Sequence, residues 1–204
     1  MSDKNDSKIS YRETFCDPMY RKASWVGITL GTITSFTGIH SIVFYSGLLF
    51  EPDFRIKGSA IIWIMNFFAS AIGLNLLHCF GRRTLLLTML AYLIVALVGI
   101  WYFAAIDQNQ TASLVVTCTW IVAFEFSFGP IFWLYVSEVC NDKATSVTTV
   151  VFWLQILAFS ILTPYMINDW LPDGRTWLFF TFFSFFGLLF IIFVMKETKG
   201  KSEE

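Results

Sequence analysis

The sequence predicts an all-α membrane protein built as a bundle of six membrane-spanning helices. The chain of 204 residues is 56% hydrophobic and only 14% charged, whereas a soluble domain carries about a quarter charged residues because its surface faces water. Its mean hydropathy of +0.63 is accordingly high. Apolar segments of about 20 residues, long enough to cross a hydrocarbon core, recur between short polar breaks. Each segment must be helical because lipid offers the backbone no hydrogen-bond partner.

Each predicted span ends where turn-forming or charged residues interrupt the apolar run. These breaks contain Pro, Gly, Asn, Asp, Lys or Arg and cover residues 51–53, 81–83, 107–110, 141–143 and 172–175. In chain order, the six predicted spans are Ser24–Phe50, Ser59–Phe80, Thr84–Ile106, Ala112–Val136, Ala144–Ile167 and Thr176–Met195.

The predicted transmembrane domain covers residues 23–196, between a polar leader of residues 1–22 and a polar tail of residues 197–204. Acidic residues interrupt the basic ones in the leader, so it matches neither a secretory signal nor a transit peptide. The first apolar helix is therefore expected to direct insertion, and the chain is expected to be a complete polypeptide. The pattern does not choose between the plasma membrane and an organellar membrane, including the mitochondrial inner membrane.

The distribution of basic residues predicts the orientation of the bundle. An even number of spans places both termini on one side of the membrane. Of the 14 Lys and Arg residues, only Arg55, Lys57 and Arg175 fall on the opposite side. Because basic loops stay on the cytosolic or equivalent side, both termini are expected on the inner side.

Composition and spacing favour neither catalysis nor a bound cofactor. A net charge of -1 and a pI near 6.1 give no reason to expect a nucleic-acid partner. The four cysteines lack the spacing of a metal site, so we expect no metal, no cofactor and no disulfide framework. A nucleophile with an adjacent base and a phosphate-binding loop are both missing from the sequence, so the chain is not expected to be an enzyme. The lipid bilayer is the first partner that the sequence indicates.

Glu125 is the one carboxylate well inside a predicted span, and His40 and His78 are the other ionisable side chains of note. Ionisable groups are costly in a bilayer and often serve ligand binding or ion pairing. The alternative for Glu125 is structural, as a protonated or amide-paired carboxyl that braces two helices. The sequence leaves both interpretations open.

Four short motifs occur in order along the chain. Residues 38–46 read Gly-Ile-His-Ser-Ile-Val-Phe-Tyr-Ser, and residues 81–83 read Gly-Arg-Arg. The fourth span contains Gly129-Pro130-Ile131-Phe132-Trp133, followed by Glu138, and residues 197–200 read Glu-Thr-Lys-Gly. This set resembles the C-terminal half, helices 7 to 12, of a sugar-porter-type transporter of the major facilitator superfamily, like the facilitative glucose transporters. The resemblance implies one half of a fold that has two six-helix halves.

The resemblance also implies roles for particular side chains. If transport is retained, a sugar would be bound by Asn66, Glu125, Trp133, His40, Gln155 and Tyr45. Aromatic rings can stack on a pyranose face while polar groups bind its hydroxyls.

Two further sets of residues would serve movement rather than binding. Gly129 and Pro130 would let the fourth span bend, because proline removes a backbone donor. Arg82 and Arg83 would form an inner-side latch with Glu138. A static kink for packing, and anchoring of the arginines at lipid headgroups, are the respective alternatives.

The chain departs from the family pattern at positions that would bind sugar. Thr34 and Ser35 stand where the family has a glutamine pair, and His40 replaces an asparagine. Leu154 replaces another asparagine, with Gln155 beside it as a partial substitute. These changes remove several amides that would otherwise bind hydroxyl groups.

One half of such a transporter would expose polar side chains to lipid, at a cost of several kcal/mol for each unsatisfied group. We therefore expect other membrane subunits, or a second transporter half, to cover this face. The first hypothesis is that the chain is not transport-competent alone and serves as an accessory or structural subunit of a larger membrane complex. The alternative is a facilitative sugar transporter that acts as a split or dimeric carrier.

Overall fold

The six spans predicted from hydropathy are present in the structure. The computed structural model describes residues 10–79 and 81–195, and for residues 74–79 the backbone alone. Helices that are long and apolar enough to cross a membrane cover Pro18–Leu49, Pro52–Gly73, Arg82–Ile106, Gln110–Val139, Asp142–Trp170 and Arg175–Phe193. The described part of the chain contains helices and no strand, which confirms the predicted fold class. The tail of residues 197–204, with its Glu-Thr-Lys-Gly motif, and the side chain of His78 lie outside what is described.

Several spans consist of more than one helical element. A short helix, α1 (Tyr11–Cys16), precedes the first span. The first span comprises α2 (Pro18–Phe36), α3 (Ile39–Tyr45) and the 3-10 helix η3 (Ser46–Leu49). The second span is α4 (Pro52–Cys79), and the third is α5 (Arg82–Trp101) with the π-helical segment η4 (Tyr102–Ile106). The remaining spans are α6 (Gln110–Glu125) with α7 (Phe128–Val139), α8 (Asp142–Tyr165) with the π-helical segment η5 (Met166–Trp170), and α9 (Arg175–Phe193).

The first span begins earlier than hydropathy predicts, inside the polar leader. Asp17 is the N-cap of α2, and its carboxylate accepts a hydrogen bond of 2.9 Å from the amide of Met19. Pro18 follows at the first helical position, where its fixed φ and missing N–H fit a helix start. Capping residues therefore set the start of this helix. Hydropathy alone misses this start, because the first turn of the helix is polar.

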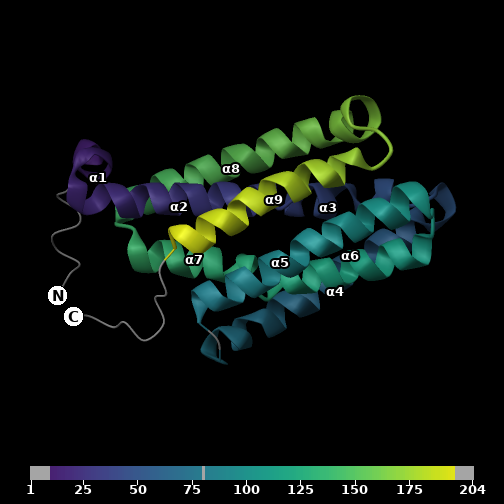
Figure 1. Ribbon diagram of the computed structural model, residues 1–204, viewed down its shortest axis with the longest axis horizontal. Coiled ribbons are helices and arrows are strands. Elements are labelled where there is room, and N and C mark those ends of the chain that lie inside the picture. Colours follow the sequence, from purple (N-terminus) through teal and green to yellow (C-terminus); the bar gives the residue numbers. More distant parts are fainter. Residues whose placement is uncertain (1–9, 80, 196–204) are drawn as a thin grey trace.

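The spans pack side by side as a bundle in which α8 and α4 occupy opposite edges (Figure 1). α2 packs against α8, α5 packs against α9, and α6 packs against both α4 and α5. α7 contacts α2 as well as α4 and α6. It therefore joins the pair α2 and α8 to the group formed by α4, α5, α6 and α9. Of the six spans, those of α4 and α8 are the least buried.

The first span bends at Gly38, between α2 and α3. Gly38 has a φ of 90°, a left-handed conformation that L side chains rarely adopt. A Cβ at this position would lie 2.9 Å from the ring of Phe180 on α9. The bend therefore requires glycine both for its backbone conformation and for the close approach of α9.

The fourth span breaks just before the Gly-Pro pair that predicts its bend. α6 ends at Glu125 and α7 begins at Phe128, so Pro130 lies in the first turn of α7. Pro130 cannot donate to the carbonyl four residues earlier, which interrupts the helical ladder at this point. At the same break the Ser127 N–H donates to the carbonyl of Phe124 at 3.0 Å, and its hydroxyl donates to the carbonyl of Ala123 at 2.7 Å.

Candidate functional site

The carboxyl group of Glu125 lies at the break in the fourth span and contacts α4. The amide of Asn66 donates to Glu125 Oε1 at 3.0 Å, and Ser70 provides a second side-chain hydrogen bond to the same carboxyl. A Cβ on Gly129 would lie 2.8 Å from Glu125 Oε2. Glycine at this position therefore leaves the space that the carboxyl group occupies.

The backbone of the same break is in close contact with α4. A Cβ on Gly73 would lie 2.3 Å from the carbonyl oxygen of Glu125, which is shorter than any real Cβ contact. Small residues at such crossings let two helices approach closely. The carboxyl of Glu125 is therefore held between α4 and the start of α7, as expected of an amide-paired residue that joins two helices.

A second group of predicted residues surrounds Phe152 on α8. The ring of Trp133 meets Phe152 edge to face at 5.5 Å between centroids, and the ring of His40 does so at 5.6 Å. Trp133 is 41% exposed, so part of its side chain is not covered by the lobe itself. His40 Nε2 is buried and has no hydrogen-bond partner among the described residues.

Gln155 lies one helical turn from Phe152 on α8. Its amide nitrogen donates to Thr32 Oγ1 on α2 at 2.9 Å. Its Oε1 atom is buried and, within residues 10–79 and 81–195, accepts no hydrogen bond. We use the name aromatic cleft for the group of side chains His40, Trp133, Phe152 and Gln155, and the name denotes these residues and no measured cavity. The group combines exposed and buried rings with two polar atoms that have no partner among the described residues.

Tyr45 is placed differently from the aromatic cleft. Its hydroxyl donates to the backbone carbonyl of Ser160 on α8. This carbonyl lacks its usual helical donor because Pro164, four residues later, has no N–H. Ser41 and Thr163 form a second link between the same helices at 2.7 Å. The Tyr45 hydroxyl is thus used to join α3 to α8.

The three residues of the predicted latch lie at the inner end of the bundle. Arg82 Nη2 contacts Glu138 Oε1 at 3.0 Å, which connects the start of α5 to the last turn of α7. Arg83 reaches another helix, where its Nη2 donates to the carbonyl of Ile192 at 2.7 Å near the end of α9. A cation there satisfies carbonyls that have no partner within their own helix. The two arginines therefore tie α5 to two different helices.

The sequence profile described as "Sugar (and other) transporter" matches residues 1–204, which is the whole chain. The chain belongs to this family. Hexose transporter 1 of Plasmodium vivax (strain Brazil I) is 30% identical over 206 residues, covering 95% of this chain and 41% of the relative. Hexose transporter 1 of Toxoplasma gondii is 30% identical over 166 residues, covering 74% of this chain and 29% of the relative.

Solved structures agree with the fold of this family. The inward-open xylose transporter of E. coli superposes with a TM-score of 0.79 at 19% identity, covering 94% of this chain and 43% of the transporter. The proton:xylose symporter bound to 6-bromo-6-deoxy-D-glucose gives a TM-score of 0.77 at 21% identity, covering 88% of this chain and 41% of the symporter. The chain thus spans less than half the length of these relatives and corresponds to half of a major facilitator fold.

The family positions that are substituted in this chain do not restore the missing amides. The hydroxyl of Thr34 donates to the carbonyl of Leu30 in its own helix at 2.8 Å. Ser35 Oγ is fully buried and has no partner within the described chain. Leu154 is exposed, whereas its neighbour Gln155 points toward α2. Gln155 is therefore the only amide side chain of the aromatic cleft as defined above.

Two residues that contact the predicted site residues, Phe152 and Thr32, were not predicted from the sequence. Phe152 contacts both His40 and Trp133, and Thr32 accepts the hydrogen bond of Gln155. Phe152 was not distinguishable because 19% of the chain is aromatic. The spacing of Phe152 and Gln155, three residues apart on one helix, places them on one face and could have indicated the pair.

Proposed function

We propose that this chain forms one lobe of a sugar-transport unit and contributes a wall of the binding site for a monosaccharide. The aromatic cleft is the observation that carries the proposal. Its exposed indole offers an apolar face for a pyranose ring, and its two unsatisfied polar atoms offer partners for hydroxyl groups. Unsatisfied buried polar atoms cost free energy, so a ligand that supplies hydrogen bonds would be stabilised there.

A particular role follows for each residue of the cleft. Trp133 would stack on the sugar, and Phe152, which is buried beneath it, would hold the indole in place. Gln155 Oε1 would accept a hydroxyl hydrogen while the Gln155 amide nitrogen stays bonded to Thr32. His40 Nε2 would take the place of the family's asparagine. Asn66 and Glu125, which are already bonded to each other, would bind a sugar only if that bond opens.

A second six-helix lobe would complete this site. The edge helices α4 and α8 expose large apolar side chains, among them Trp63, Phe67, Trp153 and Leu157. The proteins of known structure that share this fold contain a further, roughly equal length of chain. A covering lobe would also close the open side of the cleft, since a transporter site lies between two lobes that move against each other. The break before α7 and the Arg82–Glu138 contact would then serve as hinge and inner-side latch.

Binding of a labelled sugar tests the proposal. The assembly that contains this chain is extracted with its native lipid, and binding of tritiated D-glucose and D-xylose is measured by scintillation proximity. Trp133→Ala and Gln155→Leu are expected to weaken binding by about 5- to 150-fold each, as losses of about 1–3 kcal/mol predict. Trp25→Ala is the matched control, because Trp25 is 55% exposed near the start of α2, outside the cleft and outside the edge helices α4 and α8, and should change binding less than about twofold.

An accessory role in a larger membrane complex is the second candidate. It is favoured by the internal satisfaction of several polar groups, because the Glu125 carboxyl and the Tyr45 and Thr34 hydroxyls all have partners within the lobe. A structural subunit needs such bonds and no free ligand groups. Absence of saturable sugar binding, together with disassembly of the complex when the chain is depleted, would support this role. Saturable binding that Trp133→Ala abolishes would exclude it as the sole function.

A further inference from the structure

An open cavity lies at the outer end of the bundle, opposite the end that carries α1 and Arg82. It has a volume of about 340 Å³ and is lined by η3, the segment after it, η4 and the first turns of α6. A smaller cavity of about 200 Å³ adjoins it and shares Leu49, Ala104 and Gln108 with it. None of these residues belongs to the aromatic cleft, so this outer cavity is a separate feature.

Two polar atoms in the outer cavity lack a hydrogen-bond partner among residues that the structure describes. Ser113 is 1% exposed and its hydroxyl is unsatisfied, and so is the buried Oε1 atom of Gln110. The start of α6 does not use them, because the Asn109 side chain accepts from the amide of Ala112 at 3.0 Å. Buried polar atoms are normally paired with protein groups, water or a ligand.

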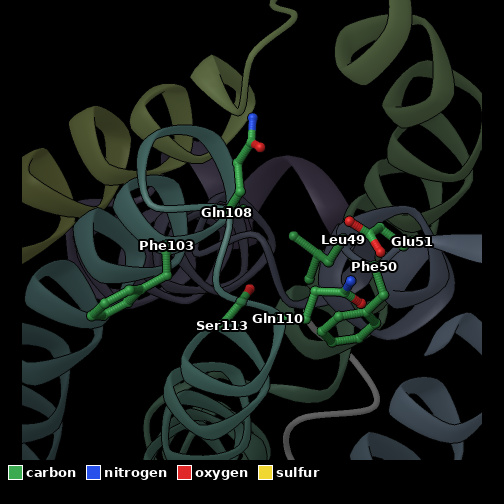
Figure 2. A pocket seen from close by; sticks show the side chains of 8 residues that line it. Leu49, Phe50, Glu51, Phe103, Gln108, Gln110 and Ser113 are labelled. Atoms are coloured by element: carbon green, nitrogen blue, oxygen red, sulfur yellow. The ribbon is translucent and has the colours of Figure 1, made fainter.

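The remaining lining defines which ligand fits. Figure 2 shows Glu51, Leu49 and Gln110 gathered on one side, Phe103 on the other and Ser113 between them. The carboxylate of Glu51 and the amide oxygen of Gln110 are acceptors, and no Lys or Arg lines the described cavity. A ligand would therefore need several hydrogen-bond donors and no negative charge. The volume is near the lower limit of about 300 Å³ for ligand pockets, which suits a molecule no larger than a monosaccharide.

We propose that this outer cavity is a second binding site, for a monosaccharide or a similar small uncharged polyol. Hydroxyl groups of the ligand donate to Glu51 and Gln110 and exchange hydrogen bonds with Ser113, while Phe50 and Phe103 contact its carbon atoms. The site lies at the outer mouth of the lobe, so it can load ligand independently of the aromatic cleft. The proposal therefore does not require that the cleft transports sugar.

Hydrogen–deuterium exchange in the native-lipid assembly tests the site, with D-glucose as the probe. Saturating D-glucose is expected to slow exchange in residues 102–113 and to leave the inner-end segment 137–145 unchanged. The double variant Ser113→Ala/Gln110→Leu should raise the half-saturating D-glucose concentration about thirtyfold, corresponding to two lost hydrogen bonds. Thr111→Ala is the matched control, because Thr111 is exposed on the same turn of α6 and does not line the cavity.

The Trp133→Ala variant separates this proposal from the proposed function. Protection of residues 102–113 that persists in Trp133→Ala supports an independent outer site, even if the wild-type cleft binds no sugar. Protection that disappears in Trp133→Ala would overturn the proposal, because the signal would then originate in the cleft. No protection in the wild-type assembly at saturating D-glucose, or an equal response in the double variant, would overturn it as well.

Discussion

Replacing Tyr45 with Phe removes one hydroxyl group that joins α3 to α8. In the wild-type chain this hydroxyl supplies the carbonyl of Ser160 with a donor, in place of the N–H that Pro164 lacks. Without the hydroxyl, the carbonyl remains in a helix interface with a donor missing. An unsatisfied buried acceptor costs about 1–3 kcal/mol, and because Tyr45 is half-buried we expect about 1–2 kcal/mol.

A second substitution should remove most of this cost. Pro164→Ala restores an N–H four residues after Ser160, so the carbonyl gains a donor within its own helix. Tyr45→Phe in the Pro164→Ala background is then expected to cost less than about 0.5 kcal/mol, which gives a coupling energy of about 1 kcal/mol between the two positions. For a chain of this size, each kcal/mol corresponds to about 2–4 °C in the unfolding midpoint.

Thermal unfolding of the four proteins of this cycle, followed in native-lipid nanodiscs, measures the coupling. Tyr92→Phe is the control, because Tyr92 has an exposed ring on α5 and should lose little stability with its hydroxyl. Equal destabilisation by Tyr45→Phe in both backgrounds would refute the reasoning, since it would mean that the missing proline N–H does not determine the value of the tyrosine hydroxyl.

Two further predictions concern close packing and thiol reactivity. Gly73→Ala should lower the unfolding midpoint although alanine favours helices by about 1 kcal/mol, because its Cβ would meet the Glu125 carbonyl oxygen at 2.3 Å and overpacking costs about 1–3 kcal/mol. Gly99→Ala is the matched control, since its Cβ would meet only a methyl group of Val116 at 3.2 Å, and a larger loss in Gly99→Ala would contradict the packing argument. Cys140 lies just after α7, and burial raises the pKa of its thiol to about 11. Below that pH the thiolate is the minor form, so maleimide at pH 7 should label the exposed Cys16 far faster than Cys140, with the Cys140 rate rising as pH approaches 11. Equal labelling at pH 7, measured by mass spectrometry, would show that Cys140 is accessible and ionised.

The sequence predicted which side chains belong to the candidate site, but not which partners they form hydrogen bonds with. Motif positions in the sequence indicated Asn66 and Glu125 as ligand contacts, and the structure bonds these two side chains to each other. The same is true of Tyr45, whose hydroxyl reaches Ser160 on a helix more than a hundred residues away in sequence. Neither partner could be identified from local patterns, because contact between two spans depends on how each helix is rotated about its own axis.

The break in the fourth span depends partly on local chemistry and partly on packing between helices. Gly129-Pro130 indicated a bend from sequence alone, because proline removes a donor wherever it lies in a helix. The structure places the break before the pair and fills the resulting space with the Glu125 carboxyl. A missing donor thus predicts that the helix is weakened, whereas the neighbouring helix α4 decides what occupies the gap.

By itself, the sequence determined that this chain crosses a membrane six times as helices, and it gave the approximate limits of each span. Lipid imposes that result locally, because every backbone group in the hydrocarbon core must find a partner within its own segment. The tertiary structure alone decided which polar side chains satisfy one another and which, such as His40, Gln155 and Ser113, keep an atom without a partner among the residues that the structure describes. Those bonds join residues on different helices, and they exist only once the helices are packed at fixed distances and rotations.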